Sequence, residues 1–95
     1  MIITFSGKII YWRGPAPFYF VTVPDEQSQV IQSISSIVTY GWGVIPAKMR
    51  TGNTELQTSL FPKGGHYLVP IKKRVRDTEN LDIDDEVTVQ LEFLV

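Results

Sequence analysis

The stretch Phe20-Val21-Thr22-Val23-Pro24 decides the interpretation of the fold, because the chain repeats its form at Tyr67-Leu68-Val69-Pro70. Each stretch is a short run of strand-forming residues that ends in a proline. A segment of helical character follows each one. Proline suits the first turn of a helix, since the N–H that it lacks has no partner there. The two stretches therefore predict two copies of a strand-to-helix transition within one chain.

Alternating apolar and polar residues predict six short strands around these stretches. Near the N-terminus, Ile3, Phe5 and Ile9 share one face, and Thr4 lies on the other. A period of two residues is typical of a strand with one face in a core. Residues 51–54, with the sequence Thr-Gly-Asn-Thr, are typical of a hairpin turn. The six predicted strands span residues 2–12, 18–23, 44–50, 55–61, 66–71 and 86–94.

Two helices are predicted, one after each proline stretch. Residues 25–38 have the pattern of an amphipathic helix. Its apolar stripe consists of Val30, Ile34, Ile37 and Val38. The β-branched residues of this stripe make the segment a weak helix former by itself, so packing has to hold it. The second helix, at about residues 72–80, is short and basic, and residues 62–65 before the fifth strand are expected to form a loop.

The element order is two strands, a helix and a strand, and the same order then follows again. We interpret residues 1–95 as one domain, with residues 1–50 and 51–95 as pseudo-repeats. Six short strands with inward apolar alternation close more easily as a barrel than as an open sheet, since closure removes exposed edges. The prediction is a mostly-β, six-stranded barrel with two short helices. An α+β sandwich with one open edge is the alternative.

Three longer motifs resemble a known family. They are Gly-Trp-Gly-Val-Ile-Pro-Ala-Lys-Met-Arg at 41–50, Thr-Ser-Leu-Phe-Pro-Lys-Gly at 58–64 and Tyr-Leu-Val-Pro-Ile-Lys-Lys-Arg-Val-Arg at 67–76. Together with Leu81 and the Asp-Glu-Val of residues 85–87, their spacing resembles the domain of unknown function family DUF1905. This resemblance implies a double-split β-barrel with pseudo-duplicated halves, and it implies no particular activity. The family usually has Gly-Asp before the last strand, where this chain has two aspartates, a departure that we expect only to change a turn.

The second half is also similar, more loosely, to the half-barrel of swapped-hairpin transition-state regulators and antitoxins. The similar residues are 69–72, Val75, Arg76, Leu81 and 85–89. Those proteins bind DNA as dimers, so this likeness implies nucleic-acid binding. Here both halves lie in one chain, so closing the barrel does not require a dimer. We therefore expect a monomer or a weak dimer.

The composition is typical of a small globular domain in a reducing compartment. The chain has 95 residues, 12% of them aromatic, and no cysteine. Without cysteine there is no disulfide, no thiolate zinc site and no cysteine nucleophile. No apolar run approaches the ~20 residues needed to span a bilayer, and the first residues lack the basic region of a signal peptide. We therefore expect a cytoplasmic protein with no membrane partner.

Charge is distributed unevenly along the chain. All nine Lys and Arg residues, but only three of the ten acidic residues, precede Asp77. Such asymmetry is found both in proteins with an anion-binding surface and in proteins whose two segments neutralise each other. Lys72 and Arg76 lie four residues apart on one helix face, an arrangement that is tolerated when an anion or an acidic segment lies opposite. The candidate ligand-binding residues are Lys48, Arg50, Lys63, Lys72 and Arg76.

Two interpretations of this basic cluster stay open. The cationic side chains either bind a phosphate or carboxylate group, or they face the acidic turn at residues 82–86. The aromatic residues likewise have two possible roles, because they either stack on bases and line a pocket or fill the core and the barrel ends. These residues are Trp12, Tyr40, Trp42 and Tyr67. Tyr11 and Trp12, which precede a Gly-Pro turn, are the pair expected to be exposed.

No catalytic or metal-binding arrangement is predicted. His66 is the single histidine, and one imidazole does not supply the ligand set of a metal site. Thr58 and Ser59 would need a base and an orienting acid to act as nucleophiles. We therefore expect no enzyme activity, no cofactor and no metal. The predicted function is a non-enzymatic binding module for a small anionic ligand or a protein partner, and a nucleic-acid-binding regulator of the antitoxin type is the alternative.

Overall fold

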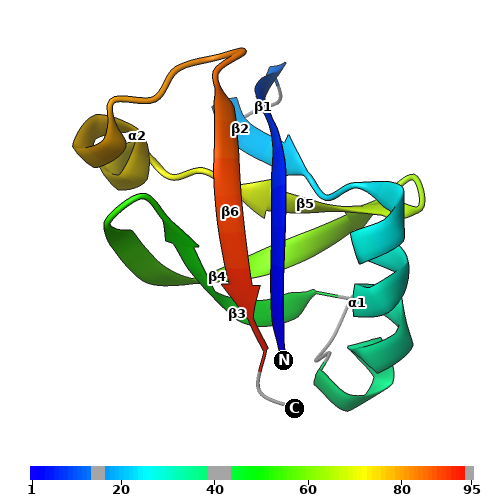
Figure 1. Ribbon diagram of the computed structural model, residues 1–95. Coiled ribbons are helices and arrows are strands. Elements are labelled where there is room, and N and C mark those ends of the chain that lie inside the picture. Colours follow the sequence, from blue (N-terminus) through cyan, green and yellow to red (C-terminus); the bar gives the residue numbers. More distant parts are fainter. Residues whose placement is uncertain (14–16, 39–43, 94–95) are drawn as a thin grey trace.

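Six strands form a closed antiparallel barrel in the order β1-β2-β5-β4-β3-β6, with two helices outside it (Figure 1). The computed structural model describes residues 1–13, 17–38 and 44–93. The elements are β1 (Ile2–Arg13), β2 (Pro17–Thr22), α1 (Asp25–Val38), β3 (Ile45–Thr51), β4 (Thr54–Lys63), β5 (His66–Pro70), α2 (Lys73–Glu79) and β6 (Glu86–Glu92). The predicted mostly-β barrel and its twice-repeated order are confirmed, and the open sandwich is wrong. Figure 1 shows the two helices at opposite sides of the barrel.

The two long strands each change partner partway along their length. β1 pairs with β6 through residues 2–8 and with β2 through residues 9–13. β4 pairs with β3 through residues 54–60 and with β5 through residues 61–63. Because both long strands belong to two sheets, the ladder closes on itself and leaves no free edge. β4 also extends through Pro62 and Lys63, which the sequence placed in a loop.

The barrel interior holds the apolar residues that alternation predicted. In β3, Ile45 and Met49 are fully buried, and in β6 Val89 and Leu91 are fully buried. Met49 and Leu91 are direct cross-strand neighbours. Each such side chain stabilises the fold by roughly 1.5–3 kcal/mol through removal of apolar surface from water. Among the described residues, no helix combines the length and apolarity needed to cross a membrane.

The buried face of α1 is only partly the predicted one. Ile34 packs against the core as predicted, and the side chains of Ile37 and Val38 lie outside the described residues. Val30 is 40% exposed, whereas Ile31 is fully buried. The reason is Ser28, a buried polar residue that periodicity assigns to the outer face. Its hydroxyl donates a hydrogen bond to the carbonyl of Val23 at 3.0 Å and accepts one from the backbone N–H of Tyr67 at 3.4 Å. These bonds tie α1 to the ends of β2 and β5 and so turn Ile31 toward the core.

Gly7 allows β1 to approach β2 closely near the point where β1 changes partner. A Cβ atom at Gly7 would lie 2.9 Å from Cγ1 of the fully buried Val21. We predict that Gly7→Ala destabilises the protein by about 1–3 kcal/mol, because the added methyl overpacks this contact. Urea unfolding followed by circular dichroism measures the change. The double variant Gly7→Ala/Val21→Ala should lose less than the sum of the two single losses; strict additivity would contradict the contact.

Candidate ligand-binding cleft

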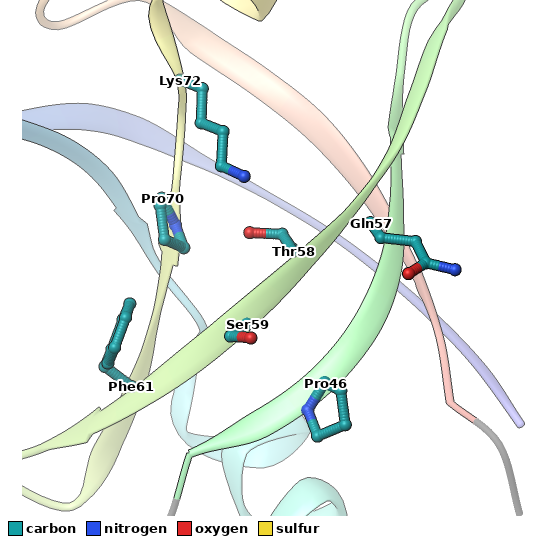
Figure 2. A pocket seen from close by; sticks show the side chains of 7 residues that line it. All are labelled: Pro46, Gln57, Thr58, Ser59, Phe61, Pro70 and Lys72. Carbon is teal, nitrogen blue, oxygen red and sulfur yellow. The ribbon is translucent and has the colours of Figure 1, made fainter.

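A cavity opens where β4 and β5 separate. Their last cross-strand pair is Phe61 with Leu68, and beyond it β4 continues along β3 while β5 continues along β2. Pro70, on β5 beside the opening, has no backbone N–H with which to extend the ladder, and Pro46 lies on β3, opposite Ser59 of β4. The cavity, called here the Lys72 cleft, has a volume of about 300 Å³. It is lined by Pro46, Gln57, Thr58, Ser59, Phe61, Pro70 and Lys72 (Figure 2).

Thr58 brings an unsatisfied hydroxyl to this cleft. The residue is only 7% exposed, and its Oγ1 atom has no hydrogen-bond partner among the described residues. Figure 2 shows the hydroxyl directed across the cleft, toward the side on which Pro70 and Lys72 lie. A buried hydroxyl without a partner costs roughly 1–3 kcal/mol. The Oγ1 atom itself is buried, so a polar group bound in the cleft would remove this cost once the cleft wall moves to admit it.

Lys72 brings an uncompensated positive charge to the same cleft. Its side chain is exposed at the N-cap position of α2, and its amine points toward Thr58 (Figure 2). All ten acidic residues of the chain lie in the parts that the structure describes, and none forms an ion pair with Lys72 or Arg76 within 4.0 Å. The acidic turn forms its own bonds instead, since the Asp85 carboxylate accepts a hydrogen bond from the backbone N–H of Asp82 at 2.8 Å.

Arg76 lies in an adjoining cavity of about 380 Å³. Its guanidinium carbon is 3.6 Å from the centroid of the Tyr19 ring, a close cation–π contact. Lys73 also reaches this cavity, but its amine bonds the Asp77 carboxylate at 2.6 Å, the pair that the spacing of four residues predicts. The cavity is lined by Phe18, Tyr19, Phe61, Pro70, Ile71, Lys72, Lys73 and Arg76. Phe61, Pro70 and Lys72 line both cavities, so the two adjoin; together they are called here the groove, and no carboxylate lines either one.

Two contacts, made by Val75 and Glu79, hold α2 and therefore Lys72 and Arg76 against the barrel. Val75 is fully buried. Asn80 ends the helix in the left-handed conformation, with φ of 57°. Thr54 of the β3–β4 hairpin donates a hydrogen bond to the Glu79 carboxylate at 2.6 Å. At Gly52 in the same turn, where φ is also 57°, any Cβ atom would overlap that carboxylate. The absence of a side chain at Gly52 thus leaves room for Glu79 of α2 against the hairpin turn.

The other predicted site residues lie elsewhere. Lys48, on the outer face of β3, has its amine 3.3 Å from the Glu55 carboxylate and 4.0 Å from that of Glu92. Arg50 is exposed on the same strand, opposite Glu55 in the β3–β4 register, and it lines neither cavity. Lys63 lies at the far end of β4, with its amine 4.8 Å from the centroid of the Trp12 ring. Of the five residues, the structure brings together only Lys72 and Arg76.

The remaining polar candidates are in structural contacts. His66 bonds the Asp25 carboxylate and so links the start of β5 to the start of α1. In residues 1–13, 17–38 and 44–93, no three His, Cys, Asp or Glu side chains gather closely enough to hold a metal ion. Tyr67 is buried, Tyr11 and Trp12 are exposed as predicted, and Tyr40 and Trp42 lie outside the described residues.

The sequence interpretation missed the aromatic walls and the hydroxyl of the groove. Phe18, Tyr19 and Phe61 were not singled out, and Thr58 was considered only as a nucleophile. One signal was present for the walls: the strand at residues 18–23 is apolar on both of its faces apart from Thr22, and the strand at residues 66–71 has Leu68 and Pro70 on the face opposite Val69. An apolar outer face on a strand indicates either a covering element or an exposed binding surface.

The link between Thr54 and Glu79 generates a stability prediction. Thr54→Val and Glu79→Gln should each destabilise the protein, because each removes or weakens a charge-assisted hydrogen bond. In a double-variant cycle measured by urea unfolding, we expect a coupling energy of about 1 kcal/mol. Thr51→Val is the matched control, because the Thr51 hydroxyl bonds the Thr88 carbonyl and not α2. A coupling energy near zero between Thr54 and Glu79 would contradict the conclusion that their hydrogen bond holds α2 against the hairpin.

The model of a family described as a domain of unknown function (DUF1905) matches residues 5–91. No curated protein matches this chain. The matched segment includes both halves of the barrel and every residue of the groove. It also agrees with the motifs at residues 41–50, 58–64 and 67–76 that resemble this family. The chain belongs to the DUF1905 family.

Proposed function

We propose that this domain is a non-enzymatic binding module that holds the carboxylate or phosphate group of a small ligand in the Lys72 cleft. One observation carries the proposal. A lysine amine without an acidic partner and a buried hydroxyl without a hydrogen-bond partner face the same cavity. After a small movement of the cleft wall that uncovers the Thr58 oxygen, an oxyanion placed between them would accept a hydrogen bond from each group.

The dimensions and walls of the cleft support a small ligand. Its volume of about 300 Å³ is at the lower end of the range for small-molecule sites. Pro46, Phe61 and Pro70 supply apolar walls, and Gln57 and Ser59 supply further polar groups. Four of its seven lining residues are polar, so the cleft is more polar than most small-molecule sites, which suits a ligand with a charged group. The ligand would then have an anionic group at Lys72 and an apolar body along Phe61.

The chemistry of the lining supports binding rather than catalysis. The side chains of the Lys72 cleft provide one amine, two hydroxyls and one amide. No carboxylate or imidazole is among them to act as a general base toward a hydroxyl nucleophile. The single histidine, His66, bonds the Asp25 carboxylate and lines a different cavity. These groups suit recognition of an anion.

Calorimetric titration at low ionic strength with inorganic phosphate, acetate and adenosine monophosphate tests the proposal. We expect saturable binding of at least one probe. Lys72→Gln should weaken that binding about tenfold or more, because it removes a charge-assisted hydrogen bond. Arg74→Gln is the matched control, since it removes the same charge from α2 at a position that does not line the cleft. Saturable binding by none of the probes, or equal losses in both variants, would contradict the proposal.

Thr58→Val separates a binding role from a structural one. Valine has nearly the shape of threonine without the hydroxyl. Because this hydroxyl is buried and unpaired, the variant should unfold at the same or a higher temperature than the wild type. The same variant should bind the anion about fivefold or more weakly. A variant that is less stable and binds the probe with unchanged affinity would show that the hydroxyl serves the fold.

A further inference from the structure

An exposed aromatic surface covers the outer face of the sheet formed by β1, β2, β5 and the end of β4. Trp12, Phe18 and Phe61 are 47%, 44% and 42% exposed. They surround a cavity of about 490 Å³. The residues that line this cavity are called here the aromatic surface; they are Trp12, Phe18, Phe20, Phe61, Pro62, Lys63 and Leu68. Three large rings exposed side by side on a small domain are typical of a binding surface.

The ring planes of Trp12, Phe18 and Phe20 are inclined to one another by between 20° and 42°. Trp12 and Phe18 are direct cross-strand neighbours, with ring centroids 6.4 Å apart and planes 20° apart. Phe20 lies 5.7 Å from Phe18 and 6.5 Å from Trp12, at interplanar angles of 34° and 42°. Phe20 is only 5% exposed, whereas Trp12 and Phe18 are the exposed rings of this group. The rings therefore offer a broad platform on which other flat groups can stack.

Cations lie on two sides of this platform. The Lys63 amine is 4.8 Å from the Trp12 centroid. Lys72 and Arg76 line the adjoining cavity, which shares Phe18 and Phe61 with the aromatic surface, while Lys73 in the same cavity is paired with Asp77. No aspartate or glutamate lines either cavity. The combined surface thus complements a ligand with flat apolar groups and several negative charges.

We propose that this surface binds single-stranded nucleic acid, with bases stacked on Trp12, Phe18 and Phe61 and phosphates near Lys63 and Lys72. Stacking of bases on aromatic side chains beside a cationic groove is how small barrels hold single strands. A duplex fits less well, because its bases already stack on one another and present only their edges. A second copy of this chain also fits less well, since a two-fold contact through this surface would bring like charges together.

The inference stands apart from the proposed anion site. It depends on Trp12 and Phe18, which do not line the Lys72 cleft, whereas the anion site depends on Thr58, which does not line the aromatic surface. Phe18 and Phe61 line both the groove and the aromatic surface, whereas Lys72 lines the groove alone. Trp12→Ala should therefore weaken nucleic-acid binding only, and Thr58→Val should weaken small-anion binding only. Either site can fail in these tests without the other.

Fluorescence anisotropy tests the inference with labelled oligothymidylate and oligouridylate of about eight nucleotides, a length within the ~4–16 nucleotides that small barrels cover. A duplex of the same length is measured in parallel at low and moderate salt. We expect a single strand to bind more tightly than the duplex. Trp12→Ala should weaken single-strand binding about tenfold or more, with a loss in the same direction for Phe61→Ala. Lys63→Gln should reduce the slope of log affinity against log salt by about 0.7.

Two controls match these variants. Ile83→Ala removes an apolar side chain that is 41% exposed and lies outside the surface, and Arg74→Gln removes a charge from the outer part of α2. Both should leave single-strand affinity within about twofold. Circular dichroism confirms that each variant is folded. The inference is overturned by no binding at low salt, by equal affinity for duplex and single strand, or by Trp12→Ala binding as the wild type does. It is also overturned if the wild type is a dimer that Trp12→Ala dissociates.

Discussion

The exchange of partners by β4 is the constraint on which the rest of the structure depends. For six strands to close as a barrel, β4 has to pair with β5 at one end and with β3 along the remainder. It cannot do both over its full length, so a gap opens beside Pro70, which has no N–H to bridge it. At the corresponding place in the first half, Gly7 lets β1 lie close against Val21. The two halves share one topology, and the second half uses the separation to form a cleft.

The same topology determines where the charged residues lie around this cleft. Because Lys72 is the second of the two residues between β5 and α2, the end of the strand carries its amine to the opening. The bond between Thr54 and Glu79 holds α2 on the β3–β4 hairpin, and the contact of Arg76 with Tyr19 places a second cation along the groove. The acidic segment that follows α2 in sequence makes its hydrogen bonds elsewhere. The Asp85 carboxylate accepts one from the backbone N–H of Asp82, and the backbone N–H of Asp84 donates one to the Ile9 carbonyl of β1 at 2.9 Å. The positive charges of the groove are therefore left for a ligand.

Much of the fold could be predicted from the sequence because strand alternation is strong in this chain, and the family motifs point to the same barrel. The face of α1 could not be predicted, because the position of Ile31 depends on tertiary hydrogen bonds made by Ser28. Charge spacing indicated Lys72 and Arg76. The pairing of Lys48 with Glu55 and Glu92 depends on the register of three strands. The unpaired hydroxyl of Thr58 depends on where two strands part, which periodicity alone does not specify.

The central claim is that the gap between β4 and β5 is a ligand site. The most direct test is to titrate ¹⁵N-labelled protein with inorganic phosphate, and in parallel with acetate, and to record the amide chemical shifts. The account predicts saturable changes for at least one anion, concentrated at Thr58, Ser59 and Lys72, with little change at Lys48 and Arg50 on β3. Changes centred on β3, changes spread evenly over all basic residues, or no saturable change with either anion would contradict it.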